Sequence, residues 1–248
     1  TDCPLYKHAT QTVFGEGPAG AKIVLVGEQP GDQEDLAGKP FVGPAGQVLD
    51  RALADAGIER TKVYVTNAVK HFKFEPRGKR RIHSKPNAAE IKICHQWVSR
   101  ELAAIEPDVV VALGATAAQS LMGKATPVGK NRGRELTWAD GRRGMITVHP
   151  SFLLRIPDAD SKAREYSEFV RDLKLAAKLA ASCASSGPGS RRALRLSTCS
   201  VVRPATRCRG VASHTARSAG AAASAAAATL AGDSPAYCGR PSQRAAQA

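Results

Sequence analysis

The chain has 248 residues and a formal net charge of +14, with a pI near 9.9. This length fits one large domain or two small ones, and the apolar fraction suffices for a packed core without disulfides. The positive charge makes a polyanion the first partner to consider, although charge alone predicts only an affinity for anions. No apolar run approaches the roughly 20 residues that span a bilayer, so we expect no membrane partner.

Residues 1–182 alternate between patterns typical of strands and patterns typical of helices. In chain order they predict a strand at 22–26, a helix at 46–56, a strand at 63–65, a helix at 88–105, a strand at 108–113, a helix at 115–122, a strand at 145–148 and a closing helix at 161–181. This order predicts a three-layer α/β/α sandwich around a central, mainly parallel four-stranded sheet. Ligands of such sheets bind at the carboxyl ends of the strands.

The composition changes at Cys183. Residues 183–248 contain no lysine, phenylalanine or tryptophan, and nine arginines stand against one acid, Asp233. They contribute about +8 of the charge and leave about +6 on residues 1–182. Because this segment lacks apolar periodicity, we expect one folded domain at 1–182 and a disordered Arg/Ala/Ser-rich tail at 183–248. The tail is either a nucleic-acid-binding segment or the product of out-of-frame translation.

Four polar motifs come after predicted strands, in positions that suit loops. They are GEQPGDQED at 27–35, TN at 66–67, KRRIH at 79–83 and HPS at 149–151. Taken singly, each suits a turn, a helix cap or a solvated loop. Because the carboxyl ends of parallel strands meet at one edge of a sheet, we expect the four motifs to form one site.

KRRIH raises a question of its own. Three consecutive cations before a lone histidine are either a solvated loop or a cationic arm that presents His83 to a substrate. The charge run by itself favours the loop, and the neighbouring motifs favour the arm.

These motifs, with PFVGPAG at 40–46 and TNAVK at 66–70, resemble those of the family 4 uracil-DNA glycosylases. GEQPG in place of GEAPG, together with KRRIH, resembles the UdgX subgroup, whose members become covalently attached to uracil-containing DNA. The similarity covers about residues 1–175. It implies a uracil-DNA glycosylase-like fold and a cytoplasmic DNA-repair enzyme of the bacterial nucleoid that acts as a monomer.

The resemblance also implies how uracil is recognised. An extruded base must be held by its edge and its faces. Phe41 resembles the ring that stacks on the flipped base, and Asn67 the amide that reads its N3 and O4 edge. An amide suits that edge because both display one donor and one acceptor. Taken alone, Phe41 would suit a core position, but Pro40 and Gly43 beside it favour a loop over a pocket.

The remaining motif residues are expected to carry the chemistry and the DNA contacts. His149 resembles the donor to uracil O2, where negative charge develops. Glu28 is expected to stabilise the sugar cation or activate a nucleophile, and Gln29 and Asp32 are expected to bind uracil and to support Glu28. His83 resembles a nucleophile that attacks C1′ and leaves a C–N bond. Contacts to the DNA backbone are expected from Lys79, Arg80, Arg81 and Ser151.

Two alternatives stay open at this point. In a conventional turnover glycosylase, water captures the sugar and His83 only contacts the DNA backbone. In a noncatalytic DNA-binding module, the fold is kept without the reaction.

The cysteines add an expected cofactor. Family 4 enzymes bind a 4Fe-4S cluster through four cysteines, and Cys3 and Cys94 match two of these positions. His71 stands at a third, either as a ligand or as a DNA-facing loop histidine. The first ligand would precede Thr1, so we expect an incomplete cluster in this polypeptide. The four cysteines of the tail lack metal-site spacing, and disulfides are not expected in the cytosol.

Overall fold

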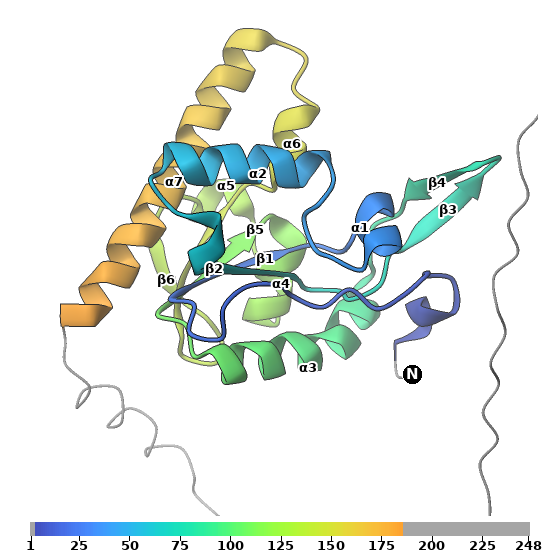
Figure 1. The fold of residues 1–248 in the computed structure, drawn as a ribbon, viewed down its shortest axis with the longest axis horizontal. Helices are drawn as coiled ribbons and strands as arrows, with labels where there is room; N and C mark the ends of the chain where they lie inside the picture. Colours follow the sequence, from blue (N-terminus) through green and yellow to red (C-terminus); the bar gives the residue numbers. More distant parts are fainter. Residues whose placement is uncertain (1–2, 186–248) are drawn as a thin grey trace, which may run out of the picture. The chain divides into compact units, whose positions relative to one another are not determined.

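The computed structural model describes residues 3–185, which form a five-stranded sheet between two layers of helices (Figure 1). The strand order is β2-β1-β5-β7-β6. The first four of these run parallel, and β6 pairs antiparallel with β7 at the edge. Their bounds are β1 (Ile23–Gly27), β2 (Val63–Asn67), β5 (Val109–Leu113), β6 (Glu135–Thr137) and β7 (Arg143–Thr147).

The predicted fold class is confirmed, but the predicted number of strands is wrong. The fifth strand, β6, has three residues, of which only Leu136 is partly buried. So short an edge strand has no apolar run that a sequence pattern can detect.

Each face of the sheet is covered by its own set of helices. Side chains of β1 alternate between the two faces: Ile23 and Leu25 join one buried cluster, while Val24 and Val26 join the other. The first cluster is completed by α2 (Pro44–Asp55), α6 (Pro150–Leu154) and α7 (Ala159–Ser185), and the second by α3 (Ala88–Ile105) and α4 (Ala115–Met122). The shorter helices are η1 (Pro4–Lys7), α1 (Asp32–Ala37), η2 (Arg60–Lys62) and α5 (Val128–Asn131).

The long helices begin and end where local chemistry dictates. In α3, the side chain of Asn87 accepts from the backbone N–H of Glu90, and the Glu90 carboxylate accepts from the N–H of Asn87. This capping box explains why the predicted bounds of α3 agree with the structure. The α2 helix begins at Pro44, two residues before the predicted start, because proline suits the first turn of a helix.

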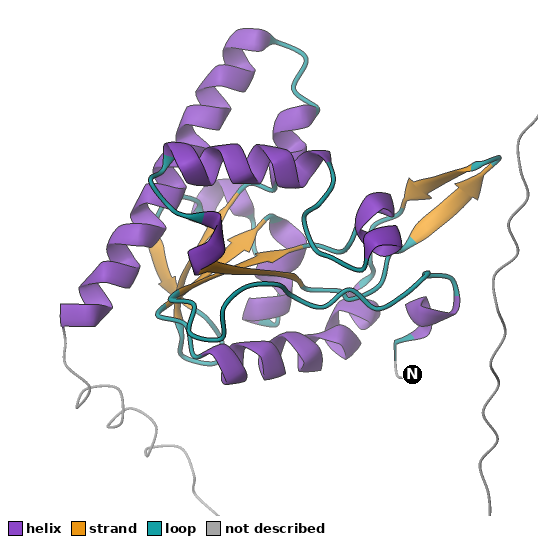
Figure 2. Cartoon of the chain, viewed as in Figure 1, coloured by secondary structure: helices purple, strands orange, loops and turns teal. Residues whose placement is uncertain are grey.

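The KRRIH segment forms a strand, whereas the sequence predicted a loop. β3 (Phe74–Arg77) and β4 (Arg80–His83) pair antiparallel through a turn at Gly78 and Lys79, and Phe74 lies opposite His83. Figure 2 shows this hairpin projecting from the body, apart from the central sheet. Both of its strands are mostly polar and exposed, so the hydrophobic pattern that marks a strand is absent.

Within residues 3–185, no helix combines the length and the apolar character needed to cross a membrane. From residue 186 onward, the predicted tail lies outside the described residues.

Candidate active site at the carboxyl ends of the strands

A pocket of about 1150 Å³ opens at the carboxyl ends of the parallel strands. All four predicted motifs contribute to its wall. Eight of the predicted site residues line it, namely Glu28, Gln29, Asp32, Phe41, Asn67, His83, His149 and Ser151. The expectation that these motifs form one site is therefore met in the structure.

Glu28 and His83 are in direct contact. The Nε2 atom of His83 lies 3.2 Å from Oε1 of Glu28, and the hydroxyl of Thr116 donates to Oε2 at 2.5 Å. Burial by itself would raise the pKa of Glu28, but the hydrogen bonds from His83 and Thr116 and the nearby histidines outweigh it, so the pKa lies below its ordinary value. Glu28 is therefore an ionised carboxylate at neutral pH that touches the predicted nucleophile.

His149 is held as a neutral hydrogen-bond donor. It is the N-cap of α6, and its Nδ1 accepts from the backbone N–H of Ser151 at 3.2 Å. Since Nδ1 accepts from this N–H it carries no proton, so the Ser151 hydroxyl, 2.8 Å away, donates to it and in turn accepts from Arg155 at 3.2 Å. Because Nδ1 accepts, the proton of the neutral ring sits on Nε2.

The surroundings of His149 also oppose its protonation. The ring keeps some exposed surface in the pocket but is densely surrounded by protein, and this burial lowers its pKa to about 4. The carboxylate of Glu28 acts in the other direction, and the charges of Arg155 and His83 add to the decrease. His149 is consequently neutral at physiological pH.

Phe41 and Asn67 form the inner wall of the pocket. The ring of Phe41 lies 6.1 Å from that of His149, and the backbone of Phe41 has a positive φ of 56°, which non-glycine residues rarely adopt. Gly27 makes room for both residues, since a Cβ there would lie 2.3 Å from Oδ1 of Asn67 and 2.6 Å from the Phe41 ring. Asn67 is 3% exposed, and no described residue hydrogen-bonds its side-chain amide.

Arg81 anchors the hairpin to the body of the domain. Its guanidinium donates to Asp32 and to Asp35, each at 2.6 Å, and lies over the rings of Phe72 and Phe74. Asp35 is fully buried; burial would raise its pKa, but hydrogen bonds from Thr10 and Arg81 lower it overall. The structure thus gives Arg81 carboxylate partners where the sequence predicted a DNA phosphate.

Gln29 holds both ends of the same hairpin. Its amide nitrogen donates to the carbonyls of Lys73 and Ser84, each at 3.1 Å, and its oxygen accepts from the N–H of Lys73 at 3.2 Å. Lys73 precedes β3 and Ser84 follows β4. The amide predicted to contact uracil therefore braces the segment that carries His83.

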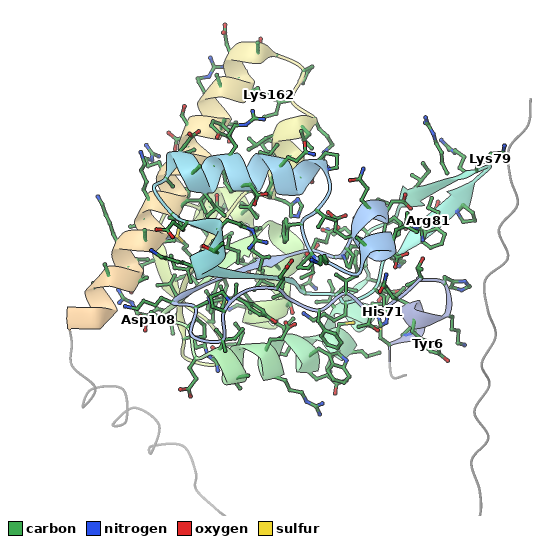
Figure 3. All side chains as sticks on the ribbon, in the orientation of Figure 1. Tyr6, His71, Lys79, Arg81, Asp108 and Lys162 are labelled. Atoms are coloured by element: carbon green, nitrogen blue, oxygen red, sulfur yellow. The ribbon has the colours of Figure 1, made fainter. Side chains whose placement is uncertain are left out.

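The other two cations of KRRIH lie away from the pocket. Lys79 and Arg80 are both exposed. Figure 3 shows Lys79 at the tip of the hairpin and Arg81 closer to the body. Only the first two of the three cations are therefore accessible to a polyanion without breaking an internal ion pair.

Comparison with known proteins finds sequence similarity over most of this domain. The profile of the Uracil DNA glycosylase superfamily matches residues 14–174. The chain belongs to this superfamily. A type-4 uracil-DNA glycosylase of Thermotoga maritima is 42% identical over 156 residues, which cover 62% of this chain and 78% of that protein. Type-4 uracil-DNA glycosylases of Pyrobaculum aerophilum and Archaeoglobus fulgidus are each 36% identical, over 62% of this chain and 79% and 78% of their own lengths.

The predicted cluster ligands of this superfamily member lie in a separate region. Cys3 and Cys94 are buried free thiols in one small cluster with Leu5, Val69 and Ile91. Burial raises the pKa of Cys94 to about 12, and its thiol interacts with that of Cys3. Nδ1 of His71 is buried without a hydrogen-bond partner among the described residues, while its Nε2 contacts Thr12 at 2.9 Å.

The two thiols that meet in this cluster are donors that suit an iron-sulfur cluster, and the buried Nδ1 of His71 has no partner among the described residues. Within residues 3–185, however, no three His, Cys, Asp or Glu side chains are grouped closely enough to hold a single metal ion. His71 as the third ligand stays a prediction.

Sequence reasoning missed three residues that support the site: Thr116, Asp35 and Arg155. Thr116 follows Gly114 at the carboxyl end of β5, so the rule that ligands bind at strand ends pointed to it. Asp35 closes GEQPGDQED, a motif that was expected to join the site without a role for this residue. Arg155 lies outside every motif, and no signal in the sequence marks it.

Proposed function

We propose that this protein is a uracil-DNA glycosylase that excises uracil from DNA and is then captured covalently on the abasic sugar through His83. The homology to type-4 uracil-DNA glycosylases supports the excision reaction. The observation that carries the capture is the 3.2 Å contact between Nε2 of His83 and the carboxylate of Glu28.

The base is recognised in the inner part of the pocket. Uracil flipped out of the stack would place its face against Phe41 and its N3 and O4 edge against the side-chain amide of Asn67. Cytosine presents the opposite donor and acceptor pattern at position 4, so a fixed amide rejects it.

Cleavage of the glycosidic bond places negative charge on uracil and positive charge on the sugar. His149 donates from Nε2 to uracil O2, and this hydrogen bond strengthens as the base becomes an anion. The carboxylate of Glu28 stabilises the developing oxocarbenium ion. A neutral histidine suits this task because its Nε2 proton is available and stays on the ring.

Capture then competes with hydrolysis. Uracil leaves with the electron pair of the glycosidic bond, and Glu28 accepts the Nε2 proton of His83. The lone pair thereby freed on Nε2 then forms the bond to C1′ of the oxocarbenium ion. The product is a neutral N-glycosyl imidazole, which has no easy hydrolytic exit. The hairpin holds His83 beside the carboxylate through Arg81 and Gln29.

We further propose a 4Fe-4S cluster held by Cys3 and Cys94, with His71 as the third ligand and a structural role near the DNA. A cluster tethers the polypeptide segments that supply its ligands. Broad absorbance near 400 nm and about four irons per polypeptide would be expected where all ligands are present. Protein that supplies all four ligands and still shows neither signal would contradict this part of the proposal.

A denaturing gel tests the reaction directly. Incubation with a uracil-containing oligonucleotide is expected to give a band that survives heat and SDS, while the same oligonucleotide with thymine gives none. Abasic sites formed catalytically without this band would indicate a turnover enzyme. Neither product would indicate a noncatalytic DNA-binding module.

The nucleophile is tested by substitution. His83→Ser is expected to abolish the stable band and to retain some release of uracil, because Glu28 and His149 remain. His8→Ser is the matched control, since His8 is exposed and does not line the pocket. A stable band in His83→Ser would show that another residue attacks the sugar.

A further inference from the structure

Beneath the pocket lies a buried ion pair that the reaction itself does not use. Lys70 is completely buried, and its Nζ lies 2.6 Å from Oε2 of Glu101, whose side chain is 11% exposed. Paired charges in such surroundings are seldom more stabilising than well-packed apolar residues, because both ions lose their hydration. An arrangement of this kind therefore suggests a role beyond stability.

All three protons of the Lys70 ammonium have a defined acceptor. Besides Glu101, Nζ donates to Oγ1 of Thr66 at 2.5 Å and to the backbone carbonyl of Asn67 at 2.9 Å. An ammonium has three donors, so its orientation is fully determined here. Through this contact, a charged group holds the peptide of the residue whose amide faces the pocket.

Glu101 ties the ammonium to three other parts of the chain. Its carboxylate accepts from the hydroxyl of Thr66 at 2.8 Å, the hydroxyl of Tyr64 at 3.3 Å and the backbone N–H of Gly15 at 2.9 Å. The ion pair thereby joins α3, β2 and the segment before β1. No described contact runs from it to Glu28, His83 or His149, so it reaches the site through Asn67.

The backbone beyond Asn67 is also immobilised. The N–H of Ala68 donates to the backbone carbonyl of Gly27 at 2.9 Å, and the N–H of Val69 donates to the backbone carbonyl of Glu28 at 3.0 Å. Lys70 holds the carbonyl of Asn67 itself through the hydrogen bond from its Nζ. A rotation of this peptide would swing the amide away from the base, whereas the walls made by Phe41 and His149 would stay in place.

We propose that Lys70, held by Glu101, is a positioning residue that sets the orientation of Asn67 and thereby the recognition of uracil. This inference rests on the proposed function only in that Asn67 reads the base. It concerns how the base is selected and does not depend on covalent capture.

The test removes the ion pair without leaving an unpaired charge. The double variant Lys70→Met/Glu101→Gln removes the donor to Asn67 and keeps an amide oxygen for Thr66, Tyr64 and Gly15. Two ligands are compared: free uracil, assayed as an inhibitor of excision, and DNA containing a tetrahydrofuran abasic site, assayed by direct binding. The abasic site has no base for Asn67 to read.

We expect inhibition by free uracil to weaken by roughly tenfold or more, because an acceptor left without its donor no longer holds the amide in place. Affinity for abasic DNA should change less than twofold. Val98→Ala is the control for a loss of core packing on α3: it is expected to lower stability without changing either affinity.

Unchanged inhibition by uracil in the folded double variant would overturn the inference, and so would an equal loss of both affinities. If the double variant does not fold, Glu101→Gln alone serves the same comparison, since it keeps Lys70 and weakens its anchor. Asn67→Ala separates the two levels. If Asn67→Ala leaves inhibition by uracil intact, the proposed role of Asn67 fails. If Asn67→Ala weakens inhibition but the Lys70 and Glu101 variants do not, only the inference about Lys70 fails.

Discussion

The pocket contains two histidines that the protein holds in opposite ways. His149 caps a helix beside the central sheet, accepts from Ser151 and is densely surrounded by protein. His83 ends a strand of the projecting hairpin, has 51% of its side chain exposed and touches Glu28. A hydrogen-bond donor acts best when it is fixed and neutral before the substrate arrives, whereas a nucleophile must be accessible and must approach the sugar.

The comparison extends to the scaffolds of the two histidines. The sheet that places His149 is made of buried apolar strands, so its position follows from the core. The hairpin is held by Arg81 with two carboxylates, by the amide of Gln29 and by the stacking of Phe74 on the buried ring of Phe72. His149 is therefore placed by the apolar core of the sheet, and His83 by polar and aromatic contacts to a hairpin.

The largest expected effect is on the fixed histidine. His149→Ala should reduce the single-turnover rate of uracil excision by about 100- to 1000-fold, as expected for the loss of one donor to a developing anion. Rapid-quench measurement of abasic sites checks this value, with thermal melting to confirm folding, since the substitution also removes a helix cap. A reduction of less than tenfold would mean that His149 is not the donor.

Removing the Arg81 anchor of the hairpin should have an intermediate effect on the reaction. Arg81→Met leaves the buried carboxylate of Asp35 unpaired, and we expect the rate of adduct formation to fall by about 30- to 100-fold through loss of the ordered hairpin. Lys79→Met is the matched control at the exposed tip. It should lower DNA affinity and reduce the slope of log affinity against log salt concentration by about 1. Equal effects of the two substitutions on the adduct rate would argue against an anchor.

The smallest effect concerns pH. The folded-state pKa of His149, about 4, lies below the ordinary value of about 6.5, so the unfolded chain binds more protons between these values. Stability therefore falls as the pH decreases from about 6.5 to about 4. The variant His149→Gln does not titrate at this position. Relative to it, we expect the free energy of unfolding of the wild type to fall by about 1–2 kcal/mol, allowing for the partial exposure of the ring.

Urea unfolding of both proteins at pH 7 and pH 4.5 measures this difference. Parallel losses in the two proteins would show that His149 does not titrate abnormally.

The parts of the protein that follow a strong local signal were predictable. Apolar β-branched runs and capped helices gave the parallel strands and the bounds of α3 and α4. The motifs at the strand ends identified the pocket residues because topology alone brings such ends together. The hairpin and β6 were missed because their strands are short, polar and exposed.

The sequence by itself determined the α/β sandwich, the edge where the site forms and the residue types that face it, because these depend on hydrophobic periodicity and strand order. Only the tertiary structure decided which partner each polar side chain takes. Arg81 pairs with two carboxylates, Gln29 binds the backbone at both ends of the hairpin, and Lys70 donates to the carbonyl of Asn67. Such choices depend on distances of a few ångströms between residues far apart in the chain, which no local pattern records.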